Sequence, residues 1–141
     1  MAGATPSYQD GVVTYEVNVA VSGGQLVEPD STTGKIKPAT ANAILCLGVS
    51  PTDAIPTATD QNPSGSINLS PKASTCAPWP FGVWRLTAVG AIAFGERVKC
   101  AAAGAVAPWV AGTDAPERIV GRCVAAAGIA NGAKGDIRLT L

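Results

Sequence analysis

The side chains that could do chemistry in this chain are few, and one type is missing. The sequence contains no histidine, so neither a Ser-His nor a Cys-His nucleophile pair can form. A lysine base would need a catalytic serine beside it, and no motif supplies one. The ten acidic residues stand mostly beside Gly, Pro or Thr, where solvated loop carboxylates are the common outcome. The sequence therefore predicts that the protein is not an enzyme.

The cysteines do not form a recognisable ligand set. Cys46, Cys76, Cys100 and Cys123 lie far apart, without a C-x-x-C pair. Three of them fall in apolar runs typical of strands, where a reduced cysteine behaves as a small hydrophobe. Buried thiols are the favoured interpretation, and a disulfide stays open as the alternative. Because calcium-loop, phosphate-loop and dinucleotide motifs are also missing, we expect no metal and no cofactor.

Aromatic residues are the remaining candidates for binding. Trp79, Phe81 and Trp84 are three aromatics within six residues. Either the two tryptophans plug the end of a β-barrel, or they are exposed at a partner surface, where tryptophan often anchors binding. The candidate partner-binding residues are Pro6, Tyr8, Trp79, Phe81, Trp84 and Trp109.

A repeated pattern of glycine and proline indicates the scaffold that must position these residues. Gly24-Gln-Leu-Val-Glu and Gly34-Lys-Ile-Lys-Pro38 correspond to Gly95-Glu-Arg-Val-Lys and Gly104-Ala-Val-Ala-Pro108. In each copy an apolar run containing a glycine follows, with Gly48 in the first and Gly121 in the second. Alternation of apolar and polar residues in these segments is typical of strands. We expect an all-β fold, a small β-barrel or sandwich with a duplicated β-motif.

The rest of the chain suggests how the domain is organised. Residues 1–10 are typical of an extended N-terminal arm, and residues 11–141 of a single β-domain. The segment 51–80 contains six of the eleven prolines and is predicted to be a long Pro-rich loop excursion, with one possible strand at 66–70. The last strand alternates, so Ile137, Leu139 and Leu141 are expected to face inward.

Composition limits the partners. Charged residues make up only 14% of the chain and the formal net charge is zero, so little repulsion opposes association and a place in an assembly is favoured. The ten basic residues are scattered along the sequence, which argues against nucleic acid. No apolar run is long enough for a membrane helix and no signal segment is evident, so we expect a soluble, unexported protein.

The second half resembles a known family in its motifs. The segments are Gly90-Ala-Ile-Ala-Phe-Gly95-Glu-Arg-Val-Lys, Gly104-Ala-Val, Ile119-Val-Gly121-Arg-Cys-Val and Gly135-Asp136-Ile-Arg-Leu-Thr-Leu141. They resemble the capsid decoration (cement) proteins of tailed bacteriophages, and the likeness covers about 12–50 and 83–141. The resemblance implies a β-rich body on the outer capsid surface of the virion, often a homotrimer, assembled in the host cytoplasm. Its partner would be the major capsid protein, and bridging subunits would stabilise the expanded head by linkage.

Two alternatives from other classes remain open. Trp79, Trp84 and Trp109 could form the aromatic platform of a carbohydrate- or receptor-binding β-module. An enzyme without histidine, such as a Ser-Lys hydrolase, is the other. If the shell assembles in a reducing cytoplasm, the cysteines are expected to be free thiols during assembly.

Overall fold

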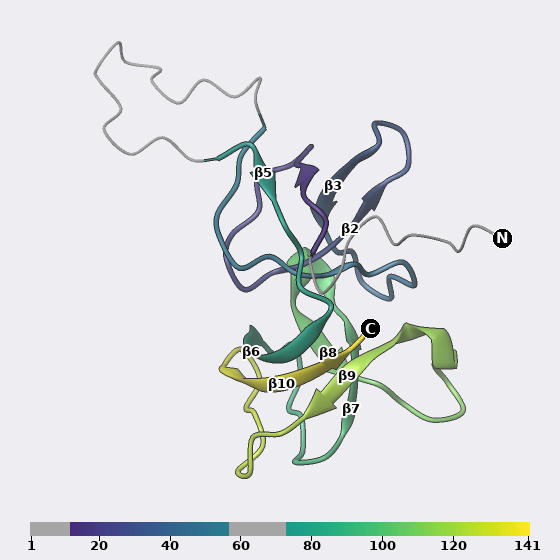
Figure 1. Ribbon diagram of the computed structural model, residues 1–141. Helices are drawn as coiled ribbons and strands as arrows, with labels where there is room; N and C mark the ends of the chain where they lie inside the picture. Colours follow the sequence, from purple (N-terminus) through teal and green to yellow (C-terminus); the bar gives the residue numbers. More distant parts are fainter. Residues whose placement is uncertain (1–11, 57–72) are drawn as a thin grey trace, which may run out of the picture.

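The computed structural model describes residues 12–56 and 73–141 (Figure 1). Within them the chain is almost entirely β, which confirms the expected class. The elements are β1 (Tyr15–Glu16), β2 (Leu26–Asp30), β3 (Lys35–Pro38), β4 (Gly48–Val49), β5 (Thr75–Cys76), β6 (Phe81–Thr87), β7 (Arg97–Cys100), β8 (Val106–Pro108), β9 (Ile119–Cys123) and β10 (Lys134–Thr140), with short 3-10 helices at Ala102–Gly104 and Pro116–Arg118. The strands form three antiparallel sheets, ordered β1-β5, β3-β2-β4 and β6-β10-β9-β7-β8.

The strand pairing confirms the duplicated motif. In both copies a central strand lies between the two strands that follow it, giving the orders β3-β2-β4 and β8-β7-β9. The register is also the same, because one valine in each copy lies opposite a proline on one side and a glycine on the other. These sets are Val27 with Pro38 and Gly48, and Val98 with Pro108 and Gly121.

The duplication extends further than the sequence pattern indicated. An antiparallel bridge joins Val49 of β4 to Trp79, three residues after the end of β5. If the segment that continues β5 is counted with it, the strands of the first half lie in the order β1-β5-β4-β2-β3. This order matches β6-β10-β9-β7-β8 strand for strand. We therefore describe the chain as a first unit (β1 to β5) and a second unit (β6 to β10), which lie in the upper and lower parts of Figure 1.

Among residues 12–56 and 73–141, neither unit closes into a continuous barrel. In the second unit a single parallel bridge between Ala88 and Val106 brings the end of β6 beside β8, and in the first unit Val17 bridges Ile36 in the same way. Longer strand pairing across these gaps would be needed for a closed barrel. Of the two expected architectures, the open sandwich therefore fits the structure.

The proline-rich segment has a defined place in the repeat. Most of it, as part of residues 50–74, joins β4 to β5, as the shorter segment 124–133 joins β9 to β10. The predicted excursion over 51–80 includes structured parts, since Ala54 bridges both Val21 and Ala73, and Thr75–Cys76 forms β5. The possible strand at 66–70 and the arm at 1–10 lie outside the described residues.

Two clusters of buried side chains support the units. The smaller contains Val17, Val21, Val27, Ile36, Ala54 and Cys76 of the first unit. The larger belongs mainly to the second unit, but it also includes Leu26, Ala39 and Val49 of the first. The two units thus share one core, which fixes the first against the second. Within residues 12–56 and 73–141, no helix is long and apolar enough to span a membrane.

The last strand confirms most of the expected alternation. Ile137 and Leu139 are buried, with 0% and 2% of their surface exposed, while Arg138 and Thr140 face solvent. The expectation that Leu141 faces inward is wrong, because 45% of its surface is exposed. Leu141 lies beyond the last paired position of β10, where only its amide is held, by the carbonyl of Pro80 at 3.2 Å.

Candidate functional site

The outer side of the large sheet carries a row of arginines. Alternation along β10 turns Arg138 to solvent. Arg138 lies opposite Arg122 of β9, and Arg122 lies opposite Arg97 of β7. Residues directly opposite each other in antiparallel strands project to the same side. Three arginines from distant parts of the sequence therefore stand side by side across three strands.

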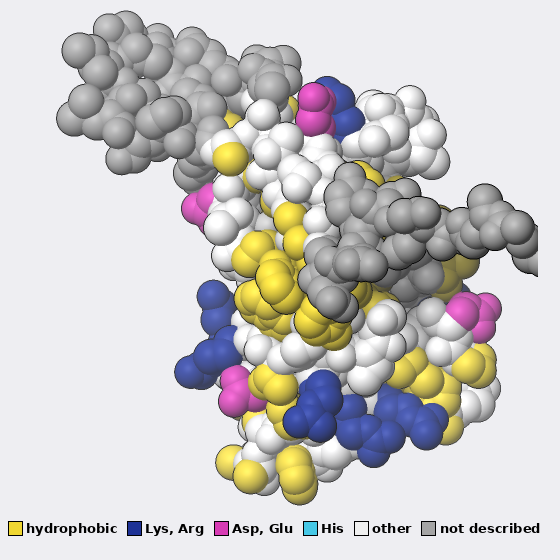
Figure 2. Space-filling view, viewed as in Figure 1, with side chains coloured by type: hydrophobic (Ala, Val, Ile, Leu, Met, Phe, Trp, Pro, Cys, Tyr) yellow, Lys and Arg dark blue, Asp and Glu magenta, His cyan; other side chains and the backbone are white. Residues whose placement is uncertain are grey.

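Two more basic side chains share this side. Arg85 of β6 lies opposite Asp136 of β10, and Lys134 precedes Asp136 by two positions, so all three project with Arg138. We call the set the basic face: Arg85, Arg97, Arg122, Lys134 and Arg138. It gathers five of the ten basic residues. Figure 2 shows Lys and Arg side chains spread across the surface of the second unit.

The basic face is distinguished by its lack of ion pairs. The other basic residues in the described parts of the chain all have a carboxylate within reach: Lys35 with Glu16 at 3.3 Å, Lys37 with Glu28 at 3.7 Å, and Lys99 and Arg118 with Asp114 at 2.6 and 3.5 Å. Among residues 12–56 and 73–141 no such ion pair involves the five members of the basic face. Their charges are therefore available to a partner. The basic residues are scattered along the sequence, as stated above, but strand pairing brings five of them together on one side of the sheet. The exclusion of nucleic acid stays a prediction.

Trp109 supports one end of the row. The guanidinium carbon of Arg97 lies 5.5 Å from the centre of the Trp109 ring, within the range of a cation–π contact. The indole N–H of Trp109 donates to the carbonyl of Ala115 at 3.0 Å. The ring is therefore fixed and holds Arg97 from one side. Trp109 was a candidate for partner binding, and the structure places it beside the basic face.

The other predicted aromatics form a cluster at the start of β6. The Trp79 ring is 5.4 Å from Phe81 and 6.3 Å from Trp84. Trp79 and Trp84 are half-buried against the core, and the Trp84 indole N–H donates to the Phe81 carbonyl at 2.9 Å. Phe81 differs, because 53% of its surface is exposed. The two tryptophans thus pack against the sheet, whereas the side chain of Phe81 is exposed to solvent.

The exposed part of this cluster borders the basic face. Val83, which is 50% exposed, lies opposite Arg138, and Phe81 is two positions earlier on the same side of β6. The outer side of the sheet therefore combines an apolar edge with a row of arginines. Aromatic and arginine side chains are enriched in protein–protein interfaces. Pro6 and Tyr8, the remaining candidates, lie outside the described residues.

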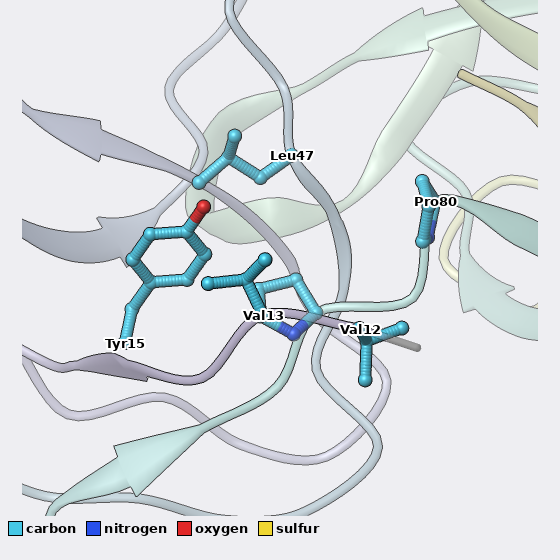
Figure 3. A pocket seen from close by; sticks show the side chains of 6 residues that line it. Val12, Val13, Tyr15, Leu47 and Pro80 are labelled. Carbon is cyan, nitrogen blue, oxygen red and sulfur yellow. The ribbon is translucent and has the colours of Figure 1, made fainter. Parts of the chain in front are cut away.

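A pocket of about 170 Å³ lies on the first unit. Its lining consists of Val12, Val13, Tyr15, Leu47, Pro78 and Pro80. Figure 3 shows the Tyr15 ring grouped with Val13 and Leu47, and its hydroxyl is the one polar side-chain group among the lining residues. This lining can hold an apolar group but offers neither a nucleophile nor a base. Among the described residues, no cluster of three or more acidic, Cys or His side chains could hold a metal.

The thiols lie mainly inside the sheets, as expected. Cys76, Cys100 and Cys123 are buried, while Cys46 is half-buried. The Cys100 thiol is hydrogen-bonded to Cys46, which lowers the pKa of Cys46 and raises that of Cys100 well above its usual range. Burial raises the pKa of Cys76. The contact joins the first unit to the second, since Cys46 precedes β4 and Cys100 ends β7.

The fold and the basic face define a protein made of two tandem copies of a five-stranded β unit, one of which carries an arginine-rich surface. No family model and no curated protein matches the sequence. Among solved structures, the chain is similar to the N base of the head fiber protein gp8.5 in bacteriophage phi29. The TM-score is 0.61 at 17% sequence identity, covering 91% of this chain and 92% of that one. Similarity at this level of identity shows that the two share a fold.

Proposed function

We propose that this protein is a non-enzymatic structural component of a bacteriophage head. The observation that carries the proposal is the fold shared with a phage head fiber base along 91% of the chain. Fold alone does not establish function. Two further features support the assignment: the chain has no histidine and few charged residues, and its outer sheet surface has the composition of a binding face rather than a catalytic cleft.

In the finer form of the proposal, the protein is a decoration protein. It binds the outer surface of the expanded head, bridges neighbouring major capsid subunits and assembles as a homotrimer in the host cytoplasm. Binding that favours the expanded state stabilises that state by mass action. The net charge of zero favours close packing of copies on a crowded shell.

The carbohydrate-binding alternative has weaker support. An aromatic platform for a sugar needs exposed ring faces. Trp79 and Trp84 pack against the core, and Trp109 lies under Arg97. The three tryptophans therefore do not form one open platform.

Co-sedimentation with expanded, undecorated phage heads tests the proposal. Unexpanded precursor shells are the control, and a saturable signal with expanded heads alone is the expected result. The plateau would give the number of copies per head, and light scattering of the free protein would give its oligomeric state. Failure to bind either shell would overturn the assignment as a decoration protein for that phage.

A further inference from the structure

The basic face concentrates positive charge that forms no ion pair within the described residues. Adjacent strands lie about 4.8 Å apart, so Arg97, Arg122 and Arg138 stand at successive strand positions in one row. Like charges directly opposite each other in a sheet destabilise it by some tenths of a kcal/mol per pair. The row thus weakens the isolated fold slightly. A partner that supplies negative charge would replace this repulsion between arginines with attraction between the arginines and the partner.

The side chains on the face indicate which kind of negative charge fits. Four of its five members are arginines, whose planar guanidinium groups bind carboxylates through paired hydrogen bonds. The cation–π contact with Trp109 leaves Arg97 less conformational freedom to lose on binding. Asp136 is the single acidic residue among the outward positions of β10, so the face keeps a strong positive excess.

The neighbouring apolar side chains favour a protein over a nucleic acid. Phe81 and Val83 are about half exposed beside Arg138, and they would contact apolar side chains of a partner. Single-stranded nucleic acid binds by stacking its bases on open aromatic rings. The Trp109 ring is already covered by Arg97. With no net charge, the whole chain also lacks the long-range attraction for polyanions that phosphate binders have.

We propose that the basic face binds a carboxylate-rich surface of a protein partner. Arg97, Arg122 and Arg138 pair with carboxylates, and Phe81 and Val83 contact apolar side chains at the edge of that surface. The inference rests on the proposed function only for naming the partner as a capsid subunit. That the partner surface carries carboxylates is inferred from the unpaired arginines and does not depend on the proposed function.

Binding to immobilised poly-L-glutamate, measured by interferometry at low salt, tests the chemistry. The variant Arg122→Gln/Arg138→Gln removes two members of the row. The matched control, Lys35→Gln/Lys37→Gln, removes the same charge from ion-paired positions on the first unit. We expect the arginine variant to bind about tenfold more weakly, because two exposed charge pairs are lost. The lysine control should stay within about twofold of the unmodified protein.

Thermal unfolding separates binding from folding. Because the row is repulsive, the arginine variant should keep its Tm or gain slightly. A clear fall in Tm would show that the arginines stabilise the fold and would overturn the proposal. Equal losses of affinity in both variants, or no loss in either, would also overturn it. Tighter binding to a single-stranded DNA oligonucleotide than to poly-L-glutamate would assign the face to nucleic acid instead.

Sedimentation of the same variants with expanded heads distinguishes the two proposals. Binding of the unmodified protein and loss of binding by the arginine variant would support both. If the arginine variant binds heads as well as the unmodified protein, the face does not contact the shell, although the head assignment stands. If poly-L-glutamate binds through the arginines but heads do not bind, the chemistry of the face stands and the head assignment fails.

Discussion

Gly48 and Gly121 hold the same position in the two units. At both glycines, a backbone carbonyl oxygen of the adjacent segment occupies the space that a Cβ atom would need. A Cβ atom on Gly48 would lie 2.3 Å from the carbonyl oxygen of Trp79, and one on Gly121 would lie 2.2 Å from that of Arg138. Trp79 and Arg138 are themselves equivalent residues of the repeat. The duplication has therefore kept a close contact between backbones, and only glycine fits there.

We predict that Gly121→Ala destabilises the protein strongly. The obstructing atoms belong to the β10 backbone, so the sheet must shift, at a cost of about 3 kcal/mol or more. Gly95→Ala is the control, because its Cβ would meet nothing within 4 Å and only the positive φ of +82° is unfavourable. The free energy of unfolding of this control should fall by roughly 1 kcal/mol. Urea unfolding followed by fluorescence compares the two, and equal losses would contradict the steric explanation.

We expect Cys46 to be the first thiol to react with alkylating reagents. The hydrogen bond from the Cys100 thiol lowers the pKa of Cys46, whereas the same contact and burial raise the pKa of Cys100. The thiolate is the reactive form, and Cys46 is also the least buried of the four. Brief treatment of the native protein with iodoacetamide at pH 8, followed by peptide mass spectrometry, measures the order. In Cys46→Ser the fast reaction should disappear; earlier labelling of Cys76 or Cys100 would refute the prediction.

Asp114 is expected to make stability depend on pH in the acid range. The hydrogen bond from Lys99, at 2.6 Å, and that from the Val110 amide, at 2.8 Å, lower the pKa of its carboxyl group. A carboxyl group with a lowered pKa stabilises the fold above its unfolded-state pKa, near 4. This contribution is lost as pH falls through the folded-state value.

The variant Asp114→Asn should therefore have a lower Tm at pH 7 and a smaller further loss of Tm as the pH falls below about 4. It would leave Lys99 and Arg118 without their shared carboxylate. Glu117→Gln, at an exposed position of the short 3-10 helix Pro116–Arg118, is the charge-matched control and should change Tm little. Parallel acid-dependence curves for Asp114→Asn and the unmodified protein would contradict the role given to Asp114.

Replacing residues 57–72 with a four-residue Gly/Ser linker is expected to leave the fold intact. The described ends of this segment are already adjacent, since the Ile55 amide donates to the Ala73 carbonyl at 2.9 Å. Shortening the segment about fourfold lowers the entropic cost of joining its two ends by roughly 1 kcal/mol. Calorimetry should give an unchanged Tm or a rise of a few degrees, and a large fall would show that the segment stabilises the core. If the segment reaches adjoining capsid subunits, the same variant should bind heads more weakly.

The sequence determined the scaffold because its signals are local. Glycines open the turns, prolines end the return strands, and apolar residues alternate with period two, so the sequence alone indicates the duplicated motif at Gly24 and Gly95. The inward direction of Ile137 and Leu139 followed from the same alternation. The wider extent of the repeat, beginning at β1, is not evident in the sequence because the first unit has very short strands and a long insertion between β4 and β5.

The site was decided by tertiary structure. Alternation shows that Arg138 faces solvent, but it does not show what lies opposite. That depends on the register of β10 against β9 and of β9 against β7, which hydrogen bonds between distant segments determine. The pairing of distant segments also gathers the scattered basic residues into one face and brings Cys46 beside Cys100. Turn and strand formation depend on neighbours along the chain, whereas a binding face depends on neighbours across the sheet.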